Sequence, residues 1–95
     1  MAVAVRVTFS GEGATLEKYR EALEAMGTSP GGKHPDSACM FHWATETDDG
    51  FKVTDVWESK EAFETFARDQ IVPVTSGLGI PQPEVDYVEV ASYLT

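Results

Sequence analysis

The run from residue 47 to residue 67, TDDGFKVTDVWESKEAFETFA, constrains the fold most because it joins a turn, a strand and a helix start. Asp49-Gly50 is a strong signal for a two-residue hairpin turn in which both central residues take positive φ. Phe51 to Trp57 alternates apolar and polar residues with the period of a strand. Ser59 then offers an N-cap to a helix with apolar residues at helical spacing. The segment predicts a hairpin whose second strand leads directly into a helix.

The rest of the chain completes an alternating order of strands and helices. Strands are predicted over residues 2–10, 38–47, 51–58 and 84–94, and helices over residues 16–26 and 60–72. Pro73 is expected to end or kink the second helix, with one further turn before Gly77. The order is the split βαβ pattern of an α+β, ferredoxin-like βαββαβ sandwich. Right-handed crossovers then place two helices on one face of a four-stranded antiparallel sheet, in a single domain over residues 1–95.

Composition limits the classes of function that the chain can serve. Sixteen acidic and seven basic residues give a formal net charge of −9, which argues against nucleic acid and anionic membrane as partners because both require a basic surface. Cys39 is the only cysteine, so no disulfide forms within the chain, and a small buried apolar role is expected for it. No apolar stretch approaches the roughly 20 residues of a membrane span. The N-terminal MAVAVRVTFS lacks a signal-peptide pattern, so a cytoplasmic location is expected.

Two near-motifs predict no bound group. Residues 27–33, GTSPGGK, match the spacing of a Walker A loop, but His34 stands where a serine or threonine would bind magnesium. The segment also follows a helix instead of a strand. His34 has no recognisable metal-ligand spacing with His42 or with Asp48-Asp49. No metal and no cofactor are therefore expected.

The register of the hairpin decides which residues share a face of the sheet. With Asp49-Gly50 as the loop, His42 lies opposite Trp57 and Ala44 lies opposite Asp55. One face of the hairpin then holds Met40, His42, Ala44, Phe51, Val53, Asp55 and Trp57. A four-residue loop keeps this grouping, whereas a three-residue loop or a bulge reverses it.

The two faces of the whole sheet are then sorted by their apolar character. The helix-facing set is expected to comprise Val5, Val7, Phe41, Trp43, Val56, Val88 and Val90. The open face is left with Arg6, His42, Asp55, Trp57, Tyr87, Glu89 and Tyr93. A face that mixes aromatic and ionisable groups predicts that a second copy packs against it around a partly lined cavity.

The hairpin FHWATETDDGFK, the phrase VTDVWESKEAFETFA and the βαββαβ order resemble the dimeric α/β-barrel superfamily, in particular small proteins related to antibiotic-biosynthesis monooxygenases. The resemblance covers essentially the whole chain. It implies a homodimer whose two sheets form a barrel, with a cleft inside the barrel or between sheet and helices. Such barrels host many reactions, so the resemblance fixes no single activity. The second helix lacks the histidine of haem-degrading relatives, and the chain lacks the asparagine of quinone-forming oxygenases.

His42 and Asp55 are the candidate catalytic residues. An imidazole transfers protons near pH 7, and a nearby carboxylate orients its tautomer. The alternative is a hydrogen-bonded structural histidine. Arg6 is a candidate for binding a substrate carboxylate or phenolate, or else forms a salt bridge to Glu89 or Asp55. The aromatic residues expected to stack on a planar ligand, or to line a dimer interface, are Trp57, Tyr87 and Tyr93.

These expectations favour a cofactor-independent oxygenase or an acid–base cyclase or isomerase that acts on an apolar or aromatic, polyketide-like molecule. His42 is the expected base, Asp55 the orienting group and Trp57 the platform for the ligand. The alternatives are a non-catalytic ligand-binding or accessory homodimer and a structural partner without a pocket.

Overall fold

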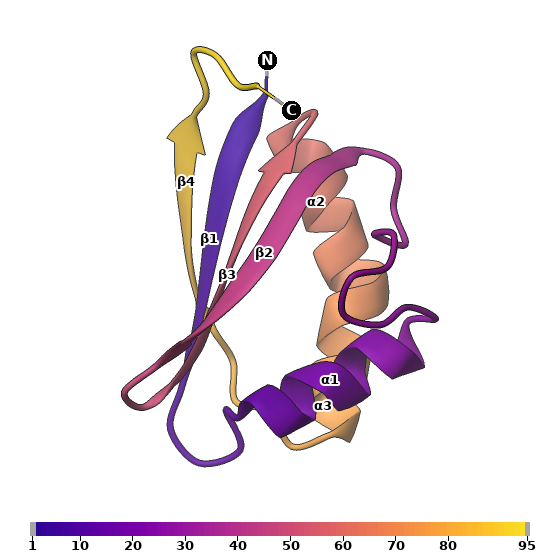
Figure 1. Cartoon of the computed structure of the whole chain (residues 1–95), viewed down its shortest axis with the longest axis vertical. Helices are drawn as coiled ribbons and strands as arrows, with labels where there is room; N and C mark the ends of the chain where they lie inside the picture. The colour runs from indigo at the N-terminus through magenta and orange to yellow at the C-terminus, as the bar shows by residue number, and fades with distance from the viewer. Residues whose placement is uncertain (1, 95) are drawn as a thin grey trace.

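The computed structural model describes residues 2–94 and shows a four-stranded antiparallel sheet with its helices on one face (Figure 1). The elements follow the order β1 (Val3–Ser10), α1 (Leu16–Ala25), β2 (Cys39–Thr47), β3 (Gly50–Trp57), α2 (Lys60–Phe66), the π-helical turn η1 (Ala67–Ile71), α3 (Val72–Gly77) and β4 (Glu84–Glu89). The strand order across the sheet is β2-β3-β1-β4. The predicted α+β ferredoxin-like fold is therefore confirmed.

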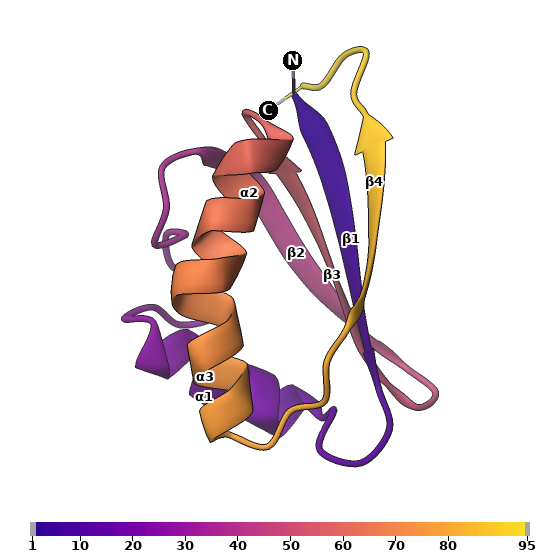
Figure 2. The same cartoon turned by 180° about the vertical axis from the view of Figure 1, so that it is seen from behind.

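The helices begin where the sequence predicts. Thr15 caps α1 by accepting a hydrogen bond from the Lys18 amide, and Ser59 caps α2 in the same way, each at 3.1 Å. Figure 2 shows α2, η1 and α3 as one continuous rod. The Val72 amide donates to the carbonyl of Ala67 in a wider, π-helical turn. This turn accommodates Pro73, which lacks an amide hydrogen and would clash in a regular helix interior.

The β2–β3 turn lies one residue earlier than predicted. Thr47 pairs with Gly50, so Asp48-Asp49 is the two-residue loop. Within residues 2–94, positive φ occurs only at five other glycines. Gly50 is needed for a different reason, because a Cβ there would collide with the carbonyl oxygen of Phe9 in β1. Close approach of two strands, and not a left-handed turn, explains this glycine.

This change shifts the register by two residues and brings the candidate pair together. His42 lies opposite Asp55 instead of Trp57, and Ala44 lies opposite Val53. A shift by two keeps each side chain on its face, so the predicted grouping is correct from Phe41 to Trp57. The prediction for Met40 is wrong, because a bulge between Cys39 and Phe41 places Cys39 opposite Trp57.

The assignment of that grouping to the open face is wrong. Four residues form one row across the sheet beneath the helices, here called the inner row: His42, Asp55, Val5 and Tyr87. A second row crosses the opposite, uncovered face, here called the outer row: Phe41, Val56, Ala4 and Val88. The prediction sorted residues by apolar character alone, whereas Asp55 can lie inside because it has hydrogen-bond partners there.

The core fills the space between the sheet and the helices. Its largest side chains are Phe9, Phe51 and Trp57 from the sheet and Phe63 and Phe66 from α2. β4 ends at Glu89, earlier than the predicted Leu94, because its neighbour β1 begins at Val3. No helix within residues 2–94 combines the length and the apolar character that a membrane span requires.

Candidate functional site

A cavity of about 560 Å³ lies between the inner face of the sheet, α1, the loop before β2 and the α2–α3 rod. This volume is within the usual range of small-molecule pockets. Apolar side chains form most of the lining. The ionisable residues in the lining are Tyr19, Lys33, His34, Cys39, His42 and Asp55. A mostly apolar cavity with a few converging polar groups suits a small organic molecule.

Asp55 is held by two hydrogen-bond donors. His42 Nδ1 lies 2.6 Å from Asp55 Oδ1, and Trp57 Nε1 donates to Asp55 Oδ2 at 2.9 Å. Asp55 is only 3% exposed. The strand period of two places Trp57 on the same face as Asp55, and the register places His42 directly opposite. Both carboxylate oxygens thus have a partner, which offsets the cost of burying the charge.

Tyr19 extends this arrangement from the helix side. Its hydroxyl lies 2.6 Å from His42 Nε2. Burial, and secondly the charge of Asp55, raises the pKa of Tyr19 above its ordinary value, so the hydroxyl keeps its hydrogen and donates it to Nε2. A neutral His42 then carries its own hydrogen on Nδ1 and donates it to Asp55. The result is a Tyr19–His42–Asp55 chain with a defined direction of hydrogen bonding.

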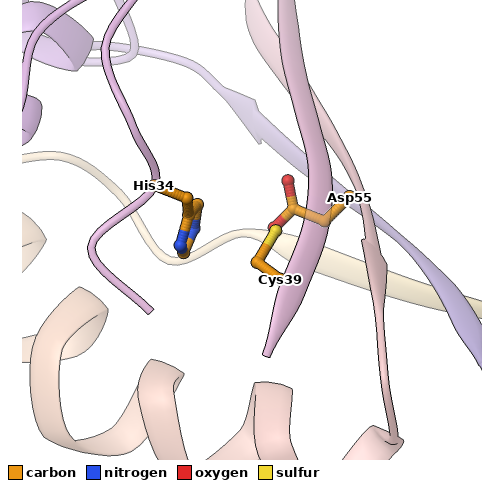
Figure 3. Close-up of side chains that lie close together, drawn as sticks. All are labelled: His34, Cys39 and Asp55. Carbon is orange, nitrogen blue, oxygen red and sulfur yellow. The ribbon is translucent and has the colours of Figure 1, made fainter. Parts of the chain in front are cut away.

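His34 and Cys39 lie beside Asp55 (Figure 3), and the His34 ring also packs against the His42 ring, with 5.6 Å between ring centres. The His34 ring packs edge-on against Trp57 with 5.3 Å between ring centres. Burial lowers the pKa of His34, while the charge of Asp55 opposes this effect. Burial, and secondly Asp55, raises the pKa of the Cys39 thiol to about 12. Cys39 is half-buried and lines the cavity, so it is more accessible than the predicted apolar core residue.

The two inner aromatic candidates for substrate binding do not line the cavity. Trp57 is 0% exposed and serves to hold Asp55, so it is not the open platform that the sequence suggested. Tyr87 packs edge-on against Phe63, and Lys60 Nζ lies 4.6 Å from its ring centre.

The other two substrate-binding candidates lie away from the cavity. Arg6 is on the outer face, where it forms an ion pair with Asp86 instead of Glu89 or Asp55. Tyr93 lies beyond the end of β4 and is exposed. Of the predicted site residues, the structure brings only His42 and Asp55 to the cavity, with Trp57 directly behind them.

The sequence interpretation did not single out Tyr19 or His34 as site residues. A signal for Tyr19 was present, because a tyrosine on the buried stripe of a helix needs a partner for its hydroxyl. No comparable signal existed for His34, whose position depends on the path of the loop between α1 and β2.

Comparison with known proteins identifies the fold. No protein-family model and no curated protein sequence matches the chain. Among solved structures, Rv0793 of Mycobacterium tuberculosis is 18% identical, with full coverage of both chains and a TM-score of 0.69. A candidate antibiotic biosynthesis monooxygenase of Chloroflexus aurantiacus is 12% identical, with 100% of this chain and 98% of that chain covered and a TM-score of 0.68. SnoaB of Streptomyces nogalater, a cofactor-independent oxygenase, is 15% identical, with 98% and 94% covered and a TM-score of 0.57. The chain therefore has the ferredoxin-like fold of antibiotic-biosynthesis-monooxygenase-like proteins, as its resemblance to them predicted.

Proposed function

We propose that the protein is an enzyme that moves a proton on a small apolar or aromatic molecule bound in the cavity. The observation that carries this proposal is the Tyr19–His42–Asp55 chain, whose three members all line a mostly apolar cavity. The fold shared with SnoaB, a cofactor-independent oxygenase, supports chemistry of this class. The substrate class that fits is a ketone or phenol on an aromatic, polyketide-like skeleton.

His42 is the base in this proposal. A substrate oxygen that enters the cavity takes over the hydrogen bond from Tyr19 and frees Nε2 of His42. Nε2 then accepts a proton from an acidic C–H or O–H of the substrate, and Asp55 stabilises the imidazolium through the hydrogen on Nδ1. Tyr19 donates its hydrogen bond to the substrate oxyanion that forms. Proton transfer by a positioned group contributes a factor of about 10²–10⁴ in rate.

The same first step serves two reaction classes. In a cyclase or isomerase, His42 returns the proton to the substrate at a different atom. In a cofactor-independent oxygenase, the deprotonated substrate itself gives electrons to dioxygen. Neither route requires a further group for the proton transfer.

Exchange of hydrogen for deuterium in β-tetralone tests the proposal without knowledge of the natural substrate. This bicyclic aromatic ketone has acidic hydrogens next to its carbonyl group, and NMR in D₂O follows their replacement. The wild-type protein should accelerate exchange above buffer, and His42→Ala should lose at least about 100-fold of that acceleration. Glu12→Gln, in the exposed loop after β1, is the matched control and should exchange like the wild type. Equal acceleration by wild type and His42→Ala would contradict the role of His42.

The second candidate function is a binding or accessory protein without catalysis, which the largely apolar cavity also suits. Fluorescence titration with β-tetralone separates the two functions. An enzyme that relies on His42 should keep binding but lose exchange in His42→Ala. A binding protein should show no exchange in any variant, and His42→Ala should only weaken binding.

We further propose that the outer face packs against a second copy of the chain. The outer row crosses all four strands with apolar side chains, and Phe41 is 58% and Val88 45% exposed. Trp43, on the same face, is 48% exposed. An apolar band of this kind favours a self-complementary contact, which a two-fold axis supplies. The homodimer implied by the resemblance thus uses the face opposite to His42.

A further inference from the structure

Three side chains of metal-ligand type that line the cavity lie close together (Figure 3). They come from separate elements: His34 from the loop before β2, Cys39 from the start of β2 and Asp55 from β3. One ligand atom from each lies within 4.8 Å of the other two. We propose that His34, Cys39 and Asp55 bind a zinc ion, a function that goes beyond the proton transfer above and does not depend on it.

The ligand set selects the type of metal. A thiolate, an imidazole and a carboxylate are all established ligands of zinc, whereas magnesium and calcium prefer sites made of oxygen atoms alone. Bonds of about 2.0–2.3 Å in a tetrahedral site separate the ligand atoms by roughly 3.3–3.8 Å. Side-chain rotations that move the three atoms by about 1 Å therefore suffice to close the site around an ion.

His34 has the supporting contact that metal-binding histidines use. Its Nδ1 lies 3.2 Å from the carbonyl oxygen of Asp36 and 3.0 Å from the amide nitrogen of the same residue. The Asp36 amide donates to Nδ1, so binding of the metal through Nε2 requires the ring hydrogen to move to Nδ1, where it donates to the Asp36 carbonyl instead. Contacts with Trp57 and Phe66 hold the plane of the ring, at 5.3 Å and 5.1 Å between ring centres.

The charges around the site also favour a cation. Asp55 is 3% exposed, and no lysine or arginine forms an ion pair with it among residues 2–94. Each carboxylate oxygen has two lone pairs, so the bonds to His42 and Trp57 leave acceptor positions free. Cys39 gives up only a weak bond, from Sγ to the Phe41 carbonyl at 3.3 Å. On binding, the S–H bond of Cys39 is replaced by an S–Zn bond, and the proton passes to solvent.

The fourth position of the ion would face the cavity, because all three ligand residues line it. His42 is not counted as a ligand, since its two ring nitrogens contact Asp55 and Tyr19. Three protein ligands and one open position are the arrangement of zinc sites that take a water or an organic ligand. The sequence spacing predicted no such site because loop, strand pairing and register assemble it together.

Titration of the untagged, chelator-treated protein with Zn²⁺, in competition with a chromophoric chelator, tests the proposal. One zinc ion per chain is expected, and Cys39→Ser and His34→Gln should each weaken binding by at least about tenfold. Asp48→Asn, in the β2–β3 turn, is the control and should bind like the wild type. Thermal unfolding of each variant checks that it folds. The absence of stoichiometric binding, or binding that both site variants retain, would overturn the proposal.

Cobalt provides a spectroscopic readout of the ligands in the wild-type protein. Co²⁺ bound by Cys39 in a four-coordinate site should give a thiolate-to-cobalt charge-transfer band in the near ultraviolet and intense visible bands. Cys39→Ser should lose the near-ultraviolet band. A wild-type protein that takes up Co²⁺ without that band would show that Cys39 is not a ligand, and would contradict the site.

Discussion

The inner and outer rows of the sheet are adjacent along the same four strands, yet they reverse the usual distribution of polar and apolar groups. The inner row includes Asp55, a carboxylate that is 3% exposed. The outer row consists of residues that are each adjacent in sequence to a member of the inner row; it is apolar and includes Phe41 at 58% exposure. The charged group lies inside and the large apolar group lies outside.

This reversal separates two functions of the sheet. A buried carboxylate is tolerated because His42 and Trp57 satisfy both of its oxygens, and the same contacts orient the imidazole toward the cavity. The exposed apolar side chains of the outer row are the basis for the proposed contact with a second copy of the chain. The inner row therefore suits chemistry, and the outer row suits association.

The two tryptophans give the largest expected difference between the faces. Trp57→Ala should lower the free energy of unfolding by about 3–5 kcal/mol, because it removes a fully buried side chain and a bond to Asp55. Trp43→Ala, on the outer face, should cost less than about 1 kcal/mol in the isolated chain. Urea unfolding at two protein concentrations measures both. Equal losses that do not depend on concentration would contradict the distinction between the faces.

Two aspartates allow a similar comparison of polar groups. Asp55→Ala should cost about 1–3 kcal/mol, since it leaves buried donors on His42 and Trp57 without an acceptor. Asp86→Ala removes an exposed ion pair with Arg6 and should cost about 0–1 kcal/mol. Chemical denaturation of the two variants in parallel measures the loss in the free energy of unfolding for each. A larger loss for Asp86→Ala would mean that the inner carboxylate is not stabilised as described.

Association should depend on the apolar part of the outer face. Phe41→Glu should weaken dimerisation at least tenfold, or about 1.4 kcal/mol, because it places a charge in the outer row. Thr8→Glu adds the same charge at the polar end of that face, opposite Lys52, and serves as the control. Sedimentation velocity over a range of concentrations gives both dissociation constants. A wild-type protein that is monomeric at micromolar concentration would contradict the proposed contact.

The smallest expected effect concerns Tyr19 at high pH. Its pKa is raised in the folded chain, so the folded state keeps the hydroxyl hydrogen where the unfolded chain has begun to lose it. The stability from this group is complete below the ordinary tyrosine pKa and is lost as pH rises through the folded value. Tyr19→Phe should therefore show a flatter decline in stability above pH 10. An identical decline in both proteins would show that Tyr19 does not contribute.

The fold could be predicted from sequence because its signals are local. The alternation in β1 and β3 and the caps Thr15 and Ser59 depend only on neighbouring residues, and the structure confirms them. The prediction for the turn at Asp49-Gly50 was wrong because Gly50 is required by the close approach of Phe9, a residue distant in sequence, and not by the turn.

The site was less predictable because its parts meet through tertiary structure. His42 and Asp55 lie on the same face because side chains alternate between the two faces along a strand, and a register shift of two residues preserves this alternation. Apolar character alone does not reveal which face of the sheet the helices cover. A polar pair such as His42 and Asp55 can lie on the covered face because the two side chains hydrogen-bond to each other. Arg6 was therefore placed beside Asp55, although it lies on the opposite face. The position of His34 depends on a loop with no periodic pattern.

The hydrogen bonds of His42 test the central claim most directly. The two ring nitrogens can be distinguished by ¹⁵N NMR of histidine-labelled protein, with His34→Gln used to assign the signals. For the neutral ring, the Tyr19–His42–Asp55 chain predicts a hydrogen on Nδ1 and an acceptor shift at Nε2, and it predicts that Tyr19→Phe changes the Nε2 signal. A His42 ring with the hydrogen on Nε2, or with averaged signals like those of free imidazole, would contradict the chain and the chemistry proposed from it.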